Sequence, residues 1–211
     1  MAASITHEAI ADQNIRAVRA SVRVVALMSD VDLARATPCA RWKLGDLLAH
    51  MTVQHDGFAA AAAGDGADLE RWQPRRFDPE TLVAEYVLAA GRIIDVFSDP
   101  AVLDRQFFLP QISTRAMFPA RQAFGLHLLE YLVHSWDVAR ALGIVYEPEP
   151  DLVNRALVIA RAVPDDDRRL RHDRAFGPAV PGLALPGSLD EILAWLGRYP
   201  GWTAAAPGRI G

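Results

Sequence analysis

The sequence predicts an all-α protein, a four-helix bundle with a long crossover and a short C-terminal extension. Three observations lead to this prediction. Four long segments carry apolar residues at helical spacing, a long proline-interrupted stretch separates the third from the fourth, and no internal repeat or low-complexity linker divides the chain. With 211 residues, of which 51% are hydrophobic, the chain is long enough to bury a proper core.

The first two predicted helices are amphipathic. Residues 6–29 place apolar side chains at helical spacing between charged ones, and a break with a Thr-Pro pair follows over residues 30–41. The second helix runs from about residue 43 to residue 63 and ends at Gly64, a residue that suits a helix C-terminus. His50 lies next to the apolar stripe of this helix.

The third helix is predicted from Asp78 to about Phe97, because an Asp followed by a Pro is a good helix start. Residues 98–119 are apolar but contain three prolines, so we expect an irregular crossing with room for a short extended piece. A loop of this length is often functional. The fourth helix covers residues 120–142 and ends at Gly143.

The C-terminal part is predicted to hold two shorter helices. One spans residues 151–163, and the other starts at a capping-box pair, Ser188 and Glu191, and runs through Leu196. Between them, DDDRRLRHD is expected to be a solvated surface segment. We therefore expect a helix bundle over residues 1–145 and an extension over 146–211 packed on it as one compact unit.

Composition excludes several classes of protein. The formal net charge of −4, the pI near 5.8 and the lack of a dense Lys/Arg stripe argue against nucleic-acid binding. No segment resembles a signal peptide or the roughly 18 to 20 apolar residues of a membrane span, so a cytoplasmic location is expected. A single cysteine, Cys39, rules out an intrachain disulfide and a thiolate-rich zinc cluster.

The fourth helix carries ionisable residues where an apolar face is expected. In LHLLEYLVHSWDVARALG, Glu130 and His134 stand one above the other, with His127 below them and Asp137 above. Burying such groups without partners costs several kcal/mol, and a metal ion is one compensating partner. The alternative is that Glu130 and His134 form only a weak local contact on an exposed helix.

Two other stretches are informative because of the order of their features. TPCARWKLGDLLAHM, residues 37–51, combines a Thr-Pro turn, Cys39, Trp42 and a helix that delivers His50, and LDEILAWLGRYPGW covers residues 189–202. Together with EYLVHSWDVARALG, the first stretch resembles the mycothiol-dependent maleylpyruvate isomerase-like family of the DinB-like helix-bundle superfamily. The second stretch resembles the C-terminal ending of a metal-binding subgroup of that family.

This resemblance implies a metal site made of His50, Glu130 and His134. The family's ion is usually zinc, and Ni(II) or Fe(II) suits the same ligands. The resemblance also implies mycothiol as a cosubstrate, a small electrophilic substrate and a homodimer. No isomerase-type C-terminal domain aligns with the short tail, which argues against maleylpyruvate itself as the substrate.

Two further residues are candidates for a catalytic role. His127 is interpreted as a group behind the ligands, a fourth ligand, a substrate-facing base or a polar core neighbour. Asp137 either accepts a hydrogen bond from the far nitrogen of His134 or pairs with Arg140 or another Arg. His55 is five residues after His50, on a different side of the helix, and should not share the metal.

Three functions remain open from the sequence. The first is a metal-dependent thiol transferase or isomerase. The second is an enzyme of the same fold whose metal acts as a Lewis acid without a thiol, for example in biosynthesis. The third is a non-catalytic metal-binding or stress-associated protein.

Overall fold

The computed structural model describes residues 2–39, 42–170, 176–182 and 184–204. Its helices are α1 (Ala2–Val25), α2 (Leu44–Ala63), α3 (Leu82–Ser98), α4 (Ala120–Leu142), α5 (Pro150–Arg161) and α6 (Leu189–Trp195), with short 3-10 turns η1 (Asp30–Asp32), η2 (Leu69–Trp72), η3 (Pro100–Asp104) and η4 (Asp167–Leu170). The described residues contain one small antiparallel pair of strands, β1 (Gln106–Phe108) and β2 (Met117–Pro119), in which Phe107 is opposite Phe118. The fold class is therefore all-α, as the sequence predicts.

Helix ends follow the local chemistry in most places. Gly64 and Gly143 end α2 and α4 in left-handed backbone conformations, with φ of 100° and 74°. The predicted start of the third helix at Asp78 is wrong by about one turn, because Asp78 accepts the backbone N–H of Glu80 and of Leu82 and so closes a separate turn before α3. Residues 98–119 include the extended piece, which is the β1–β2 pair.

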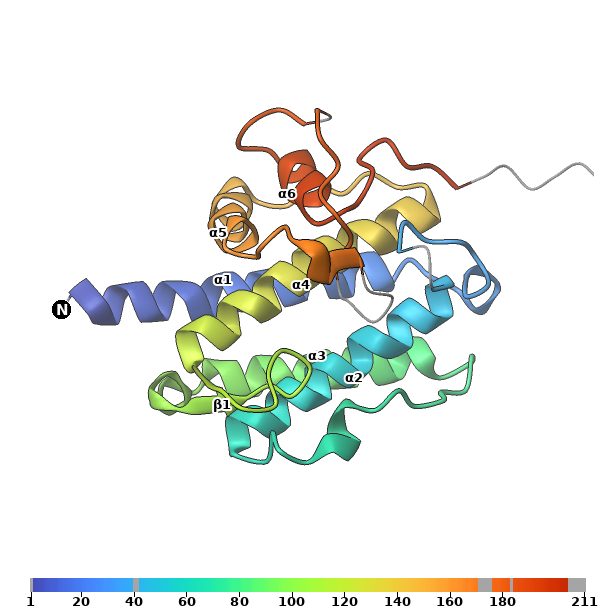
Figure 1. Cartoon of the computed structure of the whole chain (residues 1–211). Coiled ribbons are helices and arrows are strands. Elements are labelled where there is room, and N and C mark those ends of the chain that lie inside the picture. The colour runs from blue at the N-terminus through green and yellow to red at the C-terminus, as the bar shows by residue number, and fades with distance from the viewer. Residues whose placement is uncertain (1, 40–41, 171–175, 183, 205–211) are drawn as a thin grey trace, which may run out of the picture.

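Four helices form the bundle, and two loops cross it. α1 packs against α4 and α3, and α2 packs against α3 and α4, so α1 and α2 are diagonal partners, as are α3 and α4. Figure 1 shows α1 and α4 in one layer and α2 and α3 in the layer below them. The loop that joins α1 to α2 therefore crosses one end of the bundle, and the loop that joins α3 to α4 crosses the opposite end, where the sequence predicts at least one crossover.

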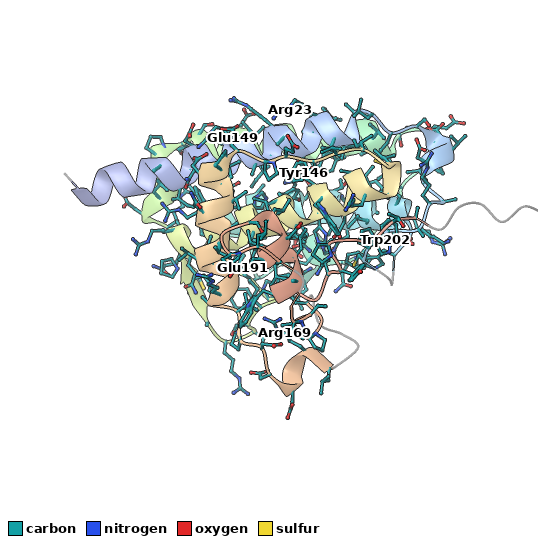
Figure 2. All side chains as sticks on the ribbon, turned by 90° about the horizontal axis from the view of Figure 1, so that it is seen from above. Arg23, Tyr146, Glu149, Arg169, Glu191 and Trp202 are labelled. Atoms are coloured by element: carbon teal, nitrogen blue, oxygen red, sulfur yellow. The ribbon has the colours of Figure 1, made fainter. Side chains whose placement is uncertain are left out.

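The C-terminal helices cover the outer face of α4. α5 packs on α4 and α6 packs on α5, on the side away from α2 and α3 (Figure 1). From above, α5, α6 and the segment that ends near Trp202 lie over α4 (Figure 2). An apolar cluster joins Leu132 and Trp136 of α4 to Leu157 of α5 and Leu193 of α6. α4 is thus buried on nearly every side from Tyr131 to Ala139, and its polar side chains lie inside the protein.

No helix among the described residues has the length and apolar composition needed to cross a membrane.

Candidate metal centre

The first site residue, His50, is positioned by the apolar stripe of α2. Leu47, Leu48 and Met51 are fully buried against the bundle core and fix the rotation of the helix. His50 sits at the edge of this stripe with 24% of its side chain exposed. The residue therefore points along the gap between α2 and α4 and keeps some access to solvent.

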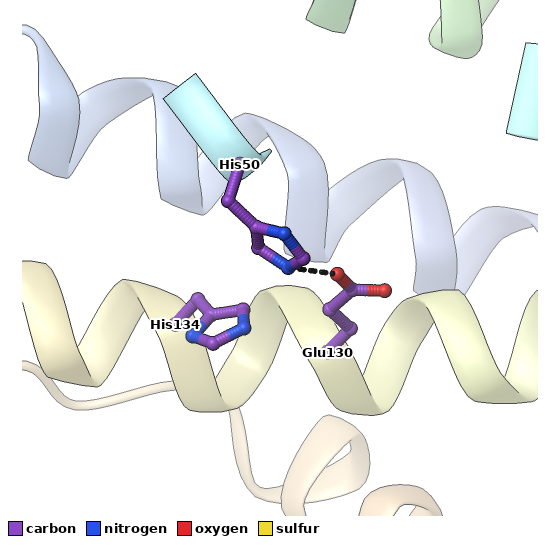
Figure 3. Close-up of side chains that lie close together, drawn as sticks. All are labelled: His50, Glu130 and His134. Atoms are coloured by element: carbon purple, nitrogen blue, oxygen red, sulfur yellow. Dashed lines mark hydrogen bonds and ion pairs between the residues drawn. The ribbon is translucent and has the colours of Figure 1, made fainter. Parts of the chain in front are cut away.

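Three side chains from α2 and α4 converge at this gap (Figure 3). His50 Nε2 lies 3.1 Å from Glu130 Oε1, and the His50 and His134 rings meet edge to face with centroids 5.4 Å apart. One possible ligand atom from each of the three residues lies within 4.8 Å of the other two. Zinc bonds of about 2.0–2.2 Å bring ligand atoms somewhat closer than this, so small side-chain rotations close the set onto one ion.

Glu130 is the anionic member of the set. Burial raises the pKa of its carboxyl, but the hydrogen bond with His50 and the neighbouring histidines outweigh burial, and the net pKa is lowered. The group is therefore a carboxylate at neutral pH. A hard anionic oxygen next to two imidazole nitrogens is a donor set that suits zinc and similar divalent ions.

His134 is held in a defined orientation by Asp137. The His134 Nδ1 lies 2.9 Å from the Asp137 Oδ2, and only 10% of the His134 side chain is exposed. Because Nδ1 carries the proton that is donated to the carboxylate, Nε2 is left with a free lone pair. Burial lowers the pKa of His134 in spite of the nearby Asp137, which favours the neutral imidazole that metal binding requires.

Asp137 is itself fully buried and has a second charged partner. Its Oδ2 also accepts from Arg198 Nη2 at 3.3 Å. Burial raises the pKa of Asp137, but the charge of Arg198 and the contact with His134 lower it further than burial raises it. The Arg partner is Arg198, which follows α6, whereas Arg140 donates to the carbonyl of Pro200.

His127 lies outside this convergent set. It is fully buried, its Nδ1 is 3.0 Å from Asn14 Oδ1, and its Nε2 is 3.2 Å from His55 Nδ1. Because Asn14 Nδ2 donates to the Phe124 carbonyl, its Oδ1 accepts from His127, and His127 Nε2 in turn accepts from His55. Of the four interpretations of His127, this placement corresponds to the polar core neighbour.

The three side chains that these hydrogen bonds link, Asn14, His55 and His127, come from three helices, α1, α2 and α4. Burial lowers the pKa of His127 to about 3 and lowers the pKa of His55 well below its ordinary value, so both imidazoles are neutral. The hydrogen bond between His55 and His127 holds α2 against α4 one to two helical turns from the proposed metal ligands. As expected, His55 is not part of the group formed by His50, Glu130 and His134. Asn14 is a polar residue between Ile10 and Val18 on the buried stripe of α1, and this position is the feature of the sequence that indicates a buried polar partner.

Trp42 forms one side of the site. Its ring centroid is 4.4 Å from that of His50 and 6.2 Å from that of His134. The residue belongs to the loop that crosses from α1 to α2, so this loop supplies an aromatic wall beside ligands held on helices. Cys39, the single cysteine, lies half-buried in the same loop.

A comparison with known families decides where the chain belongs. The family model described as the mycothiol maleylpyruvate isomerase N-terminal domain matches residues 16–139, which is more than half of the chain. The chain belongs to this family. The matched range includes His50, Glu130, His134 and Asp137, whereas Arg198 lies beyond it.

Similar sequences and similar solved structures were also found. Two uncharacterized proteins of Mycobacterium tuberculosis, MT0763 of strain CDC 1551 / Oshkosh and Rv0738 of strain ATCC 25618 / H37Rv, are each 27% identical over 187 residues, covering 85% of this chain and 94% of the relative. The crystal structure of the mycothiol-dependent maleylpyruvate isomerase matches with a TM-score of 0.56 at 14% identity, over 72% of this chain and 67% of that chain. A histidine-to-alanine mutant of that isomerase matches equally well, at 13% identity. At these identities the two structures show a shared fold.

Proposed function

We propose that this protein is a divalent-metal-binding enzyme that acts with mycothiol, or a closely related low-molecular-weight thiol, on a small electrophilic substrate as a transferase or isomerase. The observation that carries the proposal is the convergence of His50, Glu130 and His134 in a partly exposed gap of the bundle. Membership in the mycothiol maleylpyruvate isomerase family supports the thiol.

His50, Glu130 and His134 would hold the metal ion. Two imidazoles and one carboxylate that leave a coordination position open are typical of zinc sites with chemical activity, and Ni(II) or Fe(II) suits the same donors. When bound, the ion would supply a Lewis-acid centre that lowers the pKa of a nearby thiol, so that a thiolate exists near neutral pH.

The protein's own residues prepare this centre. Glu130 brings a negative charge that offsets part of the charge of the ion, and Asp137 keeps the proton of His134 on Nδ1. Trp42 lies beside both histidines and limits the access of water from that side. His127, which the sequence places near the ligands, contributes in this proposal by holding α2 and α4 in register through His55.

The substrate class follows from the thiol. A thiolate adds to activated double bonds and displaces halides, so enoyl and halogenated acids are the electrophiles to test first. We therefore propose an electrophile of this class as the substrate.

The experiment begins with metal analysis of the purified protein and of the His134→Ala and Glu130→Gln variants. We expect about one equivalent of a divalent metal in the wild type and a large loss in both variants. Glu80→Gln, which removes an exposed carboxylate in the turn before α3, is the matched control and should keep the metal. Less than about half an equivalent in the wild type, unchanged in His134→Ala, would contradict the metal site.

The second step mixes the metal-loaded protein with mycothiol and a panel of enoyl and halogenated acids and detects adducts by mass spectrometry. Adducts that depend on both the thiol and His134 support the proposed reaction. Turnover without thiol would instead indicate a Lewis-acid enzyme, and metal binding without any turnover across the panel would indicate a metal-binding protein without this activity. The cytoplasmic location, the homodimer and the division at residue 145 stay predictions.

A further inference from the structure

The segment after α6 reaches back to the metal centre through one buried arginine. Arg198 is 5% exposed, and its Nη2 donates to the Oδ2 of Asp137, the same oxygen that accepts from His134 Nδ1. Arg198 and Asp137 are separated by 61 residues of sequence. A charged side chain from the C-terminal segment is therefore buried against α4, where Asp137 alone separates it from the proposed ligand His134.

The backbone turn before Arg198 directs this side chain toward Asp137. Gly197 has a φ of 79°, and a Cβ atom there would lie 2.7 Å from the backbone of Gly177, so a glycine is required at the turn. The Arg198 backbone N–H then donates to the Leu193 carbonyl and closes the end of α6. The guanidinium lies 6.0 Å from the Phe176 ring centroid, and its Nη1 donates to the Leu196 carbonyl.

The pair explains how a carboxylate can stand behind His134 at all. Asp137 is fully buried, and a buried charge without a partner is strongly unfavourable. Arg198 supplies the compensating charge while leaving the Oδ2 able to accept from the imidazole. Each partner also has a buried polar atom without a hydrogen bond in the described part of the chain, Asp137 Oδ1 and Arg198 Nε, so the pair has the atoms for a second, parallel contact.

We infer that Arg198 is a positioning residue of the metal centre and acts through Asp137 on the orientation of His134. This inference rests on the proposed metal site and adds to it a residue outside the range that the family model matches. The C-terminal segment then helps to orient a metal ligand, in addition to covering α4.

A second consequence follows from the same contacts. If docking of the segment orients His134, metal binding to His134 must in turn favour docking of the segment, because coupling between two binding equilibria is reciprocal. Metal should therefore slow amide hydrogen exchange in residues 189–202, far along the chain from all three ligands. A cover that only shields α4 does not predict this effect.

The test compares Arg198→Met and Arg198→Lys with Arg140→Met in metal titrations. Arg140 is the matched control because its Nη2 also ties α4 to the segment, through the Pro200 carbonyl at 2.6 Å, but does not touch Asp137. Loss of a partner behind a metal-bound histidine costs roughly 10 to 100-fold in affinity, so we expect Arg198→Met to weaken Zn²⁺ and Co²⁺ binding by about tenfold. Arg198→Lys, which keeps the charge, should restore most of the affinity, and Arg140→Met should retain it.

Two readouts separate positioning from mere structural support. The visible spectrum of bound Co²⁺ should change in Arg198→Met, because it reports ligand geometry, and stay the same in Arg140→Met. Hydrogen exchange of the wild type with and without Zn²⁺ tests the coupling without any substitution, so it stands even where a variant fails to fold. Unchanged affinity and spectrum in Arg198→Met, or no metal-dependent protection in residues 189–202, overturns the inference.

The controls also show which proposal fails. When the wild type binds Zn²⁺, His134→Ala does not and Arg198→Met matches the wild type, only the role of Arg198 is lost. When the wild type binds no Zn²⁺, the proposed metal site fails and the inference falls with it.

Discussion

His50 Nε2 and Glu130 Oε1 are 3.1 Å apart, although 80 residues of chain separate the two positions. The contact joins α2 to α4, two helices that are adjacent in space and are not joined directly by a loop. An imidazole N–H and a carboxylate at this distance form a hydrogen bond, and the same two atoms are ligands for one ion once the proton has left Nε2. Both side chains thus have a polar partner in the metal-free protein, which is the other side chain, and in the metal-bound protein, where it would be the ion.

Glu130→Gln tests the charge of this pair. Glutamine keeps the size of the side chain and can still bond to His50, but it removes the negative charge that a divalent ion requires. We expect the dissociation constant for Zn²⁺ to rise by more than the roughly 100-fold that marks the upper range for partners behind the ligands. Competitive titration against a chelating dye measures the change. A variant that binds Zn²⁺ as tightly as Glu80→Gln would show that Glu130 is not a ligand.

Asn14→Leu tests the buried hydrogen bonds that link Asn14, His127 and His55. The substitution removes the acceptor of His127 Nδ1, which leaves one buried N–H unpaired, and it also removes a side-chain bond to the Phe124 carbonyl. An unpaired buried group costs about 1–3 kcal/mol, so we expect the free energy of unfolding to fall by about this amount while the metal content per folded protein stays the same. Urea unfolding measures the change. Asn154→Leu, at an exposed position of α5, is the control and should change stability little.

Acid should destabilise the metal-free protein between about pH 6.5 and pH 5. His127, with its pKa lowered to about 3 by burial, and His55, with its pKa also lowered by burial, stay neutral in the folded protein. In the unfolded chain each takes up a proton below its ordinary pKa of about 6.5. Because the unfolded state binds more protons, the free energy of unfolding falls as the pH falls, by up to about 1.4 kcal/mol per pH unit for each histidine.

Urea unfolding at several pH values in the presence of a chelator measures this slope. His127→Gln should reduce it by the contribution of one histidine. A free energy of unfolding that does not change between about pH 7 and pH 5 would show that the two histidines are not both neutral and buried.

Trp42 should report metal binding through its fluorescence. Its ring lies 4.4 Å from the ring of His50, so a paramagnetic ion such as Co²⁺ at the site quenches it efficiently. We expect saturable quenching that fits one site and that is largely absent in Trp42→Phe. Trp195→Phe, which changes a ring of α6 beneath Arg169, should keep the signal. Equal quenching in the two variants would place the ion elsewhere.

The sequence predicts the bundle well because its information is local. Helical spacing of apolar residues and the glycines at positions 64 and 143 define the ends of α2 and α4 to within about a residue. The predicted start of α3 is wrong because Asp78 and Pro79 equally suit a turn that precedes the helix. A short-range pattern does not distinguish the two.

The site was predictable only in part, for a related reason. Glu130 and His134 share a helix, and the resemblance to a family added His50. The partners that complete their surroundings are distant in sequence: Arg198 is 61 residues from Asp137, and Asn14 is 113 residues from His127. No periodicity connects such pairs, so they become visible only when the helices are assembled.

The three proposed ligands and the aromatic ring beside them come from different kinds of structure. His50, Glu130 and His134 stand on helices, whereas Trp42 comes from the connection that crosses one end of the bundle. Substitutions in that connection therefore alter what can approach the three side chains without replacing any residue of the helices that carry them. The scaffold thus allows selectivity to evolve separately from the donor set.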